Sequence, residues 1–178
     1  MKISLLNQDI GFIPKIVSRR WAMPKLEGFN SEVRWVEGFN FNGRYFDRTY
    51  LTELEKEDWL AMADTIRHRL NDEVIAKALK TWPQEIYDLD AEAINSKLKS
   101  RRNKLQQYAL DYYLFLAEKV NVLGSDKHER FEVKRLNDEE TLVTVYKTKK
   151  EGNIVKKIFE RTFHRSETKE IRLYGFEG

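Results

Sequence analysis

Residues 90–124 read DAEAINSKLKSRRNKLQQYALDYYLFLAEKVNVLG and predict one long amphipathic helix. Asp90 suits the N-cap position and Gly124 suits a helix stop. The apolar side chains recur at spacings of three, four and seven, which is the spacing of one helical face: Ile94, Leu98, Leu105, Tyr108, Ala109, Tyr112, Leu116 and Val120. A helix of roughly 30 residues would be about 45 Å long. Because this exceeds the width of a small domain, we expect one end to project or to carry a second module.

The segment before this helix is rich in aromatic side chains and glycine between residues 11 and 50. Combined with arginines such as Arg19, Arg20 and Arg34, these aromatics could form a stacking platform for nucleic acid or sugar. The alternative is that they pack onto the helices, and we favour it because aromatic side chains dominate protein cores.

Shorter helices are expected between this segment and the long helix. Phe46, Tyr50 and Leu54 have the spacing of a short helix. Thr52 to Glu55 fits a capping box for the helix that follows it. A clearer helix is predicted by one apolar stripe: Trp59, Met62, Ala63, Ile66 and Leu70. Asn71 and Asp72 then suit the start of a further helix, which Trp82-Pro83 would end. The short connections favour an antiparallel bundle.

After Gly124 the hydrophobic period changes from about 3.6 residues to about 2, which indicates strands. Four strands are expected, at residues 131–134, 141–147, 155–163 and 169–174, in an antiparallel meander. One face would carry Phe159, Phe163, Ile171 and Leu173, and the other Lys157, Arg161, Glu170 and Arg172. We expect the apolar face to pack on the C-terminal half of the long helix, because so small a sheet needs cover.

The predicted fold class is therefore α+β. Residues 1–124 form an aromatic-rich segment plus a helical bundle built on the long helix, and residues 125–178 form the four-stranded antiparallel meander. We expect the two parts to unfold as one cooperative unit.

The composition offers little catalytic chemistry. The chain has no cysteine, three histidines and a net charge of +3, which gives no strong attraction to nucleic acid or an anionic membrane. No phosphate-binding glycine loop, nucleophile elbow or zinc-protease motif is present. Asp126, His128 and Glu129 form a candidate polar cluster, but no second cluster of ligands accompanies it. We therefore assign no catalytic residue, no metal ligand and no cofactor.

Five cations stand close together on the long helix and form a candidate polyanion-binding face: Lys97, Lys99, Arg101, Arg102 and Lys104. Such a face could follow a phosphate backbone. The favoured interpretation is a solvated helix face paired with acidic neighbours, because lysine and arginine are ordinary surface residues of long helices. Nucleic acid is therefore not the expected partner.

Four stretches carry a family resemblance: residues 18–26 (SRRWAMPKL), 98–105 with Tyr112-Tyr113, 124–129 (GSDKHE) and 167–175 (ETKEIRLYG). Together they resemble the middle region of large envelope proteins of Gram-negative bacteria, in which a calcineurin-like metallophosphoesterase domain is joined to a C-terminal outer-membrane surface-antigen barrel. The resemblance implies a fragment of such a protein, a cell-envelope location and the other domains of the parent as partners. The metal ligands of the phosphoesterase lie outside this region, so no catalytic residue is carried over.

The sequence shows no secretory signal and no run of 18 apolar residues that could span a membrane. The expected function is a non-catalytic structural or interaction module, a fragment of a larger cell-envelope phosphoesterase-like protein. The alternative is a nucleic-acid or polyanion-binding domain that uses the basic face of the long helix.

Overall fold

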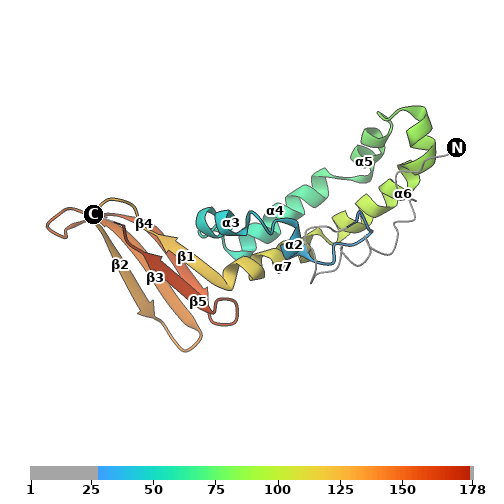
Figure 1. Ribbon diagram of the computed structural model, residues 1–178. Helices are drawn as coiled ribbons and strands as arrows, with labels where there is room; N and C mark the ends of the chain where they lie inside the picture. Colours follow the sequence, from blue (N-terminus) through green and yellow to red (C-terminus); the bar gives the residue numbers. More distant parts are fainter. Residues whose placement is uncertain (1–27, 177–178) are drawn as a thin grey trace. The chain divides into compact units, whose positions relative to one another are not determined.

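The computed structural model describes residues 28–176 and confirms an α+β fold in which helices precede strands (Figure 1). The helices are α2 (Val36–Phe39), α3 (Arg44–Tyr50), α4 (Lys56–Arg69), α5 (Asp72–Leu79), α6 (Gln84–Asn103) and α7 (Leu105–Ala117). The strands are β1 (Lys119–Leu123), β2 (Glu129–Arg135), β3 (Glu140–Thr148), β4 (Ile154–His164) and β5 (Glu170–Tyr174). The predicted aromatic segment before residue 28, with the first of the four resembling stretches, lies outside the described residues.

The described chain divides into two compact units. Unit 1 contains residues 28–41 and Lys56–Tyr112, and unit 2 contains Asn42–Glu55 and residues 113–176. The boundary falls within α7, so this one helix contributes to both units. Whether the chain unfolds as one cooperative unit stays a prediction.

The single long helix predicted over residues 90–124 is wrong in three respects. Helix α6 starts at Gln84, directly after Pro83, so Asp90 is not an N-cap but a buried residue inside the helix. The helix is interrupted at Lys104, whose N–H bonds to the carbonyl oxygens of Arg101 and Arg102 before α7 begins. Finally, α7 ends at Ala117.

Residues 119–123, predicted to continue the helix, instead form strand β1. The sequence Lys-Val-Asn-Val-Leu alternates, and its two β-branched residues, Val120 and Val122, are both buried. Val120 also fitted the helical spacing, because a single apolar residue can satisfy both a helical period of 3.6 residues and a strand period of 2.

Unit 1 is helical and has a small apolar interior. The predicted start of α5 is confirmed, because the Asn71 side chain accepts a hydrogen bond from the Val74 N–H at 2.9 Å. Ile75 and Leu79 of α5 are buried, as is Ala91 of the neighbouring α6. The predicted α4 is also present, with Ala63 as its buried residue.

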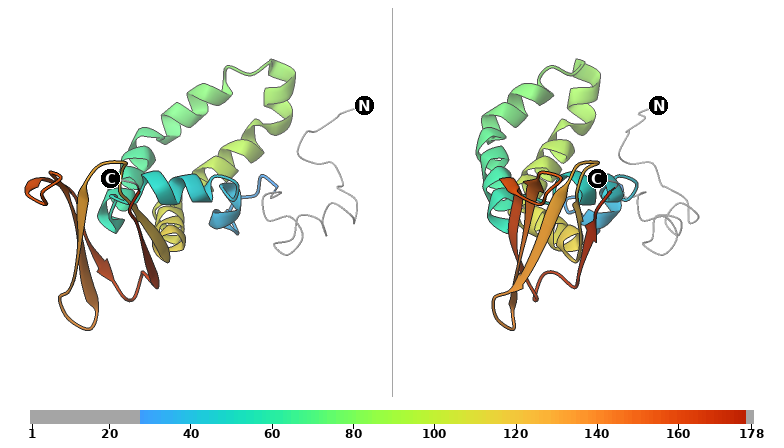
Figure 2. Two further views of the ribbon diagram at one scale, coloured as in Figure 1. Left: turned by 60° about the vertical axis from the view of Figure 1, so that its left-hand side comes forward. Right: turned by 90° about the vertical axis from the view of Figure 1, so that its left-hand side faces the viewer.

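Unit 2 contains two sheets rather than the predicted four-stranded meander. Strands β2, β3 and β4 form an antiparallel sheet in that order (Figure 2). Strand β5 does not extend it; β5 pairs in parallel with β1, with Val120 opposite Ile171. The backbone explains this choice, because the N–H groups of Lys169 and Glu170 both donate to the carbonyl oxygen of Glu118 and so direct β5 toward β1.

The apolar faces of the two sheets meet and form the core of unit 2. This core consists of Val120 and Val122 from β1, Val143 and Val145 from β3, and Phe163 from β4. The three-stranded sheet is therefore covered by β1 within this core. At the end of α7, Tyr113, Leu116 and Ala117 are also buried.

Arg161 corrects the predicted faces of the sheet. Cross-strand partners point to the same side, and Arg161 stands opposite Val143 while Phe159 stands opposite Val145. Arg161 therefore shares the inward face with Phe159 and Phe163 and is only 5% exposed. The prediction that it lies on the solvated face is wrong.

Candidate functional site

The basic residues predicted on the long helix lie on α6 and at its C-cap, and acidic or carbonyl groups of unit 1 bind most of them. Lys99 forms an ion pair with Asp72 at 2.9 Å, and Arg102 pairs with the same carboxylate. Arg102 also donates to the Leu70 carbonyl at 3.2 Å. The hydrogen bonds from Lys99 first, and from Arg102 second, lower the pKa of Asp72. These two cations therefore fasten the start of α5 to α6.

The other three cations contact the segment before α2. Nε of Arg101 donates to the Asn30 carbonyl at 2.7 Å, and its guanidinium lies 4.2 Å from the ring centroid of Phe29. Lys97 approaches the same ring at 6.0 Å, and Lys104 pairs with Glu32. All five residues of the predicted polyanion-binding face thus have structural partners.

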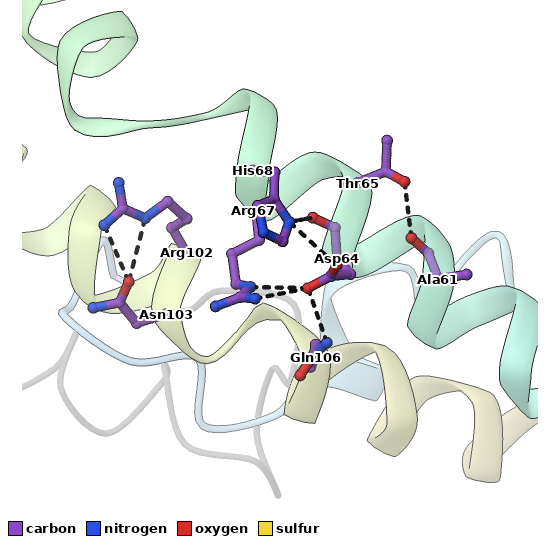
Figure 3. A network of polar contacts seen from close by, with 8 residues as sticks. All are labelled: Ala61, Asp64, Thr65, Arg67, His68, Arg102, Asn103 and Gln106. Atoms are coloured by element: carbon purple, nitrogen blue, oxygen red, sulfur yellow. Dashed lines mark hydrogen bonds and ion pairs between the residues drawn. The ribbon is translucent and has the colours of Figure 1, made fainter.

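A second polar network joins α4 to α7 inside unit 1 (Figure 3). Arg67 and Gln106 both donate to one oxygen of Asp64, at 2.8 Å and 3.2 Å, while Nδ1 of His68 lies 3.2 Å from its other oxygen. The hydrogen bond from Arg67 is the main cause of the lowered pKa of Asp64. His68 is thereby accounted for as an i, i+4 partner of Asp64 at a helix end.

The predicted polar cluster of Asp126, His128 and Glu129 does not form a metal site in the structure. Glu129 turns its carboxylate to Ser125 and accepts from the Ser125 N–H at 2.8 Å and from its hydroxyl at 2.6 Å. Across residues 28–176, no group of three or more histidine, cysteine, aspartate or glutamate side chains could hold a metal ion.

Gly124 has a different role from the predicted helix stop. It follows β1, and its N–H donates to the Tyr174 carbonyl at 2.8 Å. A Cβ at this position would meet the Glu129 carboxylate, and it would lie 3.2 Å from that same carbonyl oxygen. A side chain at this position would therefore displace the Glu129 carboxylate from the place where it bonds to Ser125.

Two arginines hold the residue 42–55 segment in unit 2: Arg48, which the sequence analysis did not name, and Arg161, which it placed on the solvated face. Arg48 donates to the Phe115 carbonyl at 2.9 Å and lies 4.7 Å from the centroid of that ring. Arg161 donates to the Thr52 carbonyl at 2.6 Å. Alternate residues of a strand share one face, so the two-residue spacing of 159, 161 and 163 in β4 is the sequence signal that could have placed Arg161 inward.

Helix α3 rests on these polar anchors and has no buried residue. Its large aromatic side chains face solvent: Tyr45, Phe46 and Tyr50 are 64%, 67% and 67% exposed. We call them the α3 aromatic face. The rings of Phe46 and Tyr50 contact each other with centroids 4.4 Å apart, and the Arg44 guanidinium lies 4.2 Å from the Tyr45 centroid. The sequence predicted a helix here from Phe46 and Tyr50, but as an inward-facing one.

None of the described helices combines the length and the apolar character needed to cross a bilayer. Comparison of the chain with protein-family models, with curated proteins and with solved structures gave no match.

Proposed function

We propose that this chain is a non-catalytic interaction module that docks onto another domain of a larger cell-envelope phosphoesterase-like protein through the α3 aromatic face. The observation that carries the proposal is the orientation of α3, a helix with no buried residue whose three exposed residues are two tyrosines and a phenylalanine.

Exposed aromatic side chains at one place are costly in water, since each ring can bury about 150–250 Å² when it is covered. Scattered apolar residues are normal on protein surfaces, whereas adjacent ones indicate a binding site. Tyrosine and arginine are also enriched among the residues that contribute most to binding energy. Arg44 beside Tyr45 supplies that combination at the edge of the face.

The face is held in place before any partner arrives. Arg48 bonds to the end of α7, and Thr52 bonds to Arg161 of β4, so both the middle of α3 and the turn that follows it are fixed. A preformed surface loses less conformational entropy on binding. This fits a permanent contact between domains.

The test is site-specific photocrosslinking in cells that make the protein with its natural flanking sequence. Phe46 is replaced by p-benzoylphenylalanine, and Met62, which is similarly exposed at 61% but lies on α4, is replaced as the matched control. We expect position 46, and not position 62, to give a discrete crosslinked species whose peptides come from another domain of the same polypeptide. Crosslinks to a second copy, to unrelated proteins, or equally from both positions would contradict the proposal.

The non-catalytic part of the proposal has its own test. We expect the purified chain with added divalent metal to show no turnover of a phosphomonoester, because a two-metal site needs several convergent ligands. Metal-dependent turnover that disappears in His128→Ala would overturn it. The alternative of polyanion binding through α6 is weakened by the partners of its five cations, and a steep salt dependence of DNA or RNA binding would restore it.

A further inference from the structure

A small basic pocket lies in unit 2, between the turn that follows β1 and the turn that joins β3 to β4. Its volume is about 210 Å³. Its cationic wall consists of Lys127, Lys149 and Lys150, with the imidazole of His128 beside them, and Phe131 and Phe176 supply an apolar side. We call this the hairpin pocket. It involves neither the α3 aromatic face nor the cations of α6.

The cations of this pocket differ from those of α6 because no carboxylate of the described residues pairs directly with their ammonium groups. In the part of the chain that the structure describes, Lys127, Lys149 and Lys150 form no ion pair. Glu129 also lines the pocket, but its carboxylate is bound by the N–H and hydroxyl of Ser125. Three lysine charges against the single carboxylate of Glu129 leave the lining of the pocket positive, and a positive lining attracts anions.

The backbone around the pocket is well fixed. The Thr148 N–H donates to the His128 carbonyl at 2.8 Å and so joins the two turns. In the β3–β4 turn, the Lys149 N–H donates to the Asn153 carbonyl and the Gly152 N–H donates to the Lys149 carbonyl, both at 2.9 Å. Gly152 has φ +85°, a conformation that glycine adopts without strain. The lysines therefore project from anchored positions.

We propose that the hairpin pocket binds the phosphate group of a compact phosphomonoester. Ammonium groups form short charge-assisted hydrogen bonds with phosphate oxygens, and three of them suit a dianion. The pocket is smaller than the 300–1,000 Å³ typical of sites for drug-sized ligands, so it admits a headgroup-sized anion. Phe131 and Phe176 offer contact to the carbon attached to the ester oxygen. The same group occurs on soluble esters and on phosphatidic acid.

The experiment measures binding by the full chain with glycerol 3-phosphate as the soluble probe and vesicles of phosphatidic acid in phosphatidylcholine as the lipid probe. Ionic strength is held constant with sodium chloride. The test variant is Lys149→Gln/Lys150→Gln. The matched control is Lys77→Gln/Lys80→Gln on and just after α5, which changes the net charge equally at exposed positions that do not line the pocket. Circular dichroism verifies that each variant is folded.

We expect glycerol 3-phosphate to shift the backbone amide resonances of Lys127, Lys149 and Lys150. Its Kd should rise at least tenfold in the test variant, equivalent to about 1.4 kcal/mol, and stay within twofold in the control. Lys127→Gln, which alters only the other turn, should also weaken binding. Binding to vesicles alone, with the same dependence on Lys149 and Lys150, would assign the lipid as the source of the group. No binding to either probe, or equal losses in both double variants, would overturn the proposal.

Discussion

Nη2 of Arg161 donates a hydrogen bond to the Tyr113 hydroxyl oxygen at 3.2 Å, and that hydroxyl donates in turn to a carboxylate oxygen of Glu167 at 2.6 Å. Nη1 of Arg161 bonds to the Thr52 carbonyl. The guanidinium also lies 4.8 Å from the ring centroid of Phe163. One buried arginine thus connects β4, the end of α7, the turn after α3 and, through Tyr113, the turn before β5.

Arg161→Ala should destabilise unit 2 strongly. Hydrogen bonds to charged groups contribute about 1.5–3 kcal/mol each, and the change leaves the Thr52 carbonyl and the Tyr113 hydroxyl without this donor. We expect a loss of about 3 kcal/mol in the free energy of unfolding, measured by urea denaturation. Arg165→Ala, at an exposed position beyond the end of β4, is the control and should stay within about 0.5 kcal/mol. Equal effects of the two changes would contradict the role given to Arg161.

Tyr113 should make stability depend on alkaline pH. Burial, followed by the hydrogen bond to Glu167, raises the pKa of Tyr113 from 10.0 to about 12. Because the folded state holds the neutral form, this contribution is complete below pH 10 and is lost as the pH rises toward about 12.

The measurement is the free energy of unfolding of the wild type and of Tyr113→Phe between pH 8 and 11. The variant is expected to be less stable at pH 8, since two hydrogen bonds are lost, and its free energy should fall less steeply above pH 10. Tyr108→Phe is the matched control and should retain the slope of the wild type. Parallel curves for wild type and Tyr113→Phe would show that Tyr113 is not the titrating group.

The positions of the strands after Gly124 were predicted better than the way in which the strands pair. All four strands after Gly124 were expected near their observed positions, because alternation is a local property of the sequence. The partner of β5 was not predictable in this way, since it depends on the carbonyl of Glu118, which receives the N–H groups of Lys169 and Glu170 across the fold. Strand β1 was missed because Val120 also falls at the helical spacing of the preceding apolar positions.

The candidate sites show a similar limit. The sequence favoured acidic neighbours as partners of the five cations, but only the fold identifies the partners as Asp72, Glu32 and the carbonyl of Asn30. The hairpin pocket was not predicted, because its cations come from two turns far apart in the sequence. The sequence does show one part of it, the pair Lys149-Lys150 close to Gly152.

Asn71→Ala should weaken the start of α5. The side chain of Asn71 satisfies the N–H of Val74, which has no partner within the helix. Losing an N-cap costs about 1 kcal/mol, whereas glycine at the same position costs only a few tenths. We therefore expect Asn71→Gly to be more stable than Asn71→Ala in thermal unfolding, and the reverse order would argue against a capping role.

Gly152→Ala should strain the β3–β4 turn. No atom lies within 4 Å of an added Cβ, so the effect comes from the backbone conformation at φ +85°. A non-glycine residue in this region costs roughly 1–2 kcal/mol. Gly175→Ala, also in open space but without a positive φ, is the control and should be nearly neutral. The decisive comparison is between their urea midpoints, and a neutral Gly152→Ala would mean that the turn can adopt another conformation.

Leu116→Ala tests whether the end of α7 and the sheet of unit 2 unfold together. Leu116 is buried at 7% exposure, while Leu114, on the same helix, is 38% exposed and serves as the matched control. A buried leucine-to-alanine change costs about 2–5 kcal/mol. If the sheet depends on this helix end, hydrogen exchange in residues 141–163 should accelerate in Leu116→Ala by the amount that corresponds to its loss of stability, and hardly at all in Leu114→Ala. The contact of Tyr113 with Arg161 gives the physical reason, because a displaced α7 end would withdraw the tyrosine hydroxyl from β4. Unchanged protection of β3 and β4 in a folded Leu116→Ala variant would instead mean that the sheet is stable without the helix end.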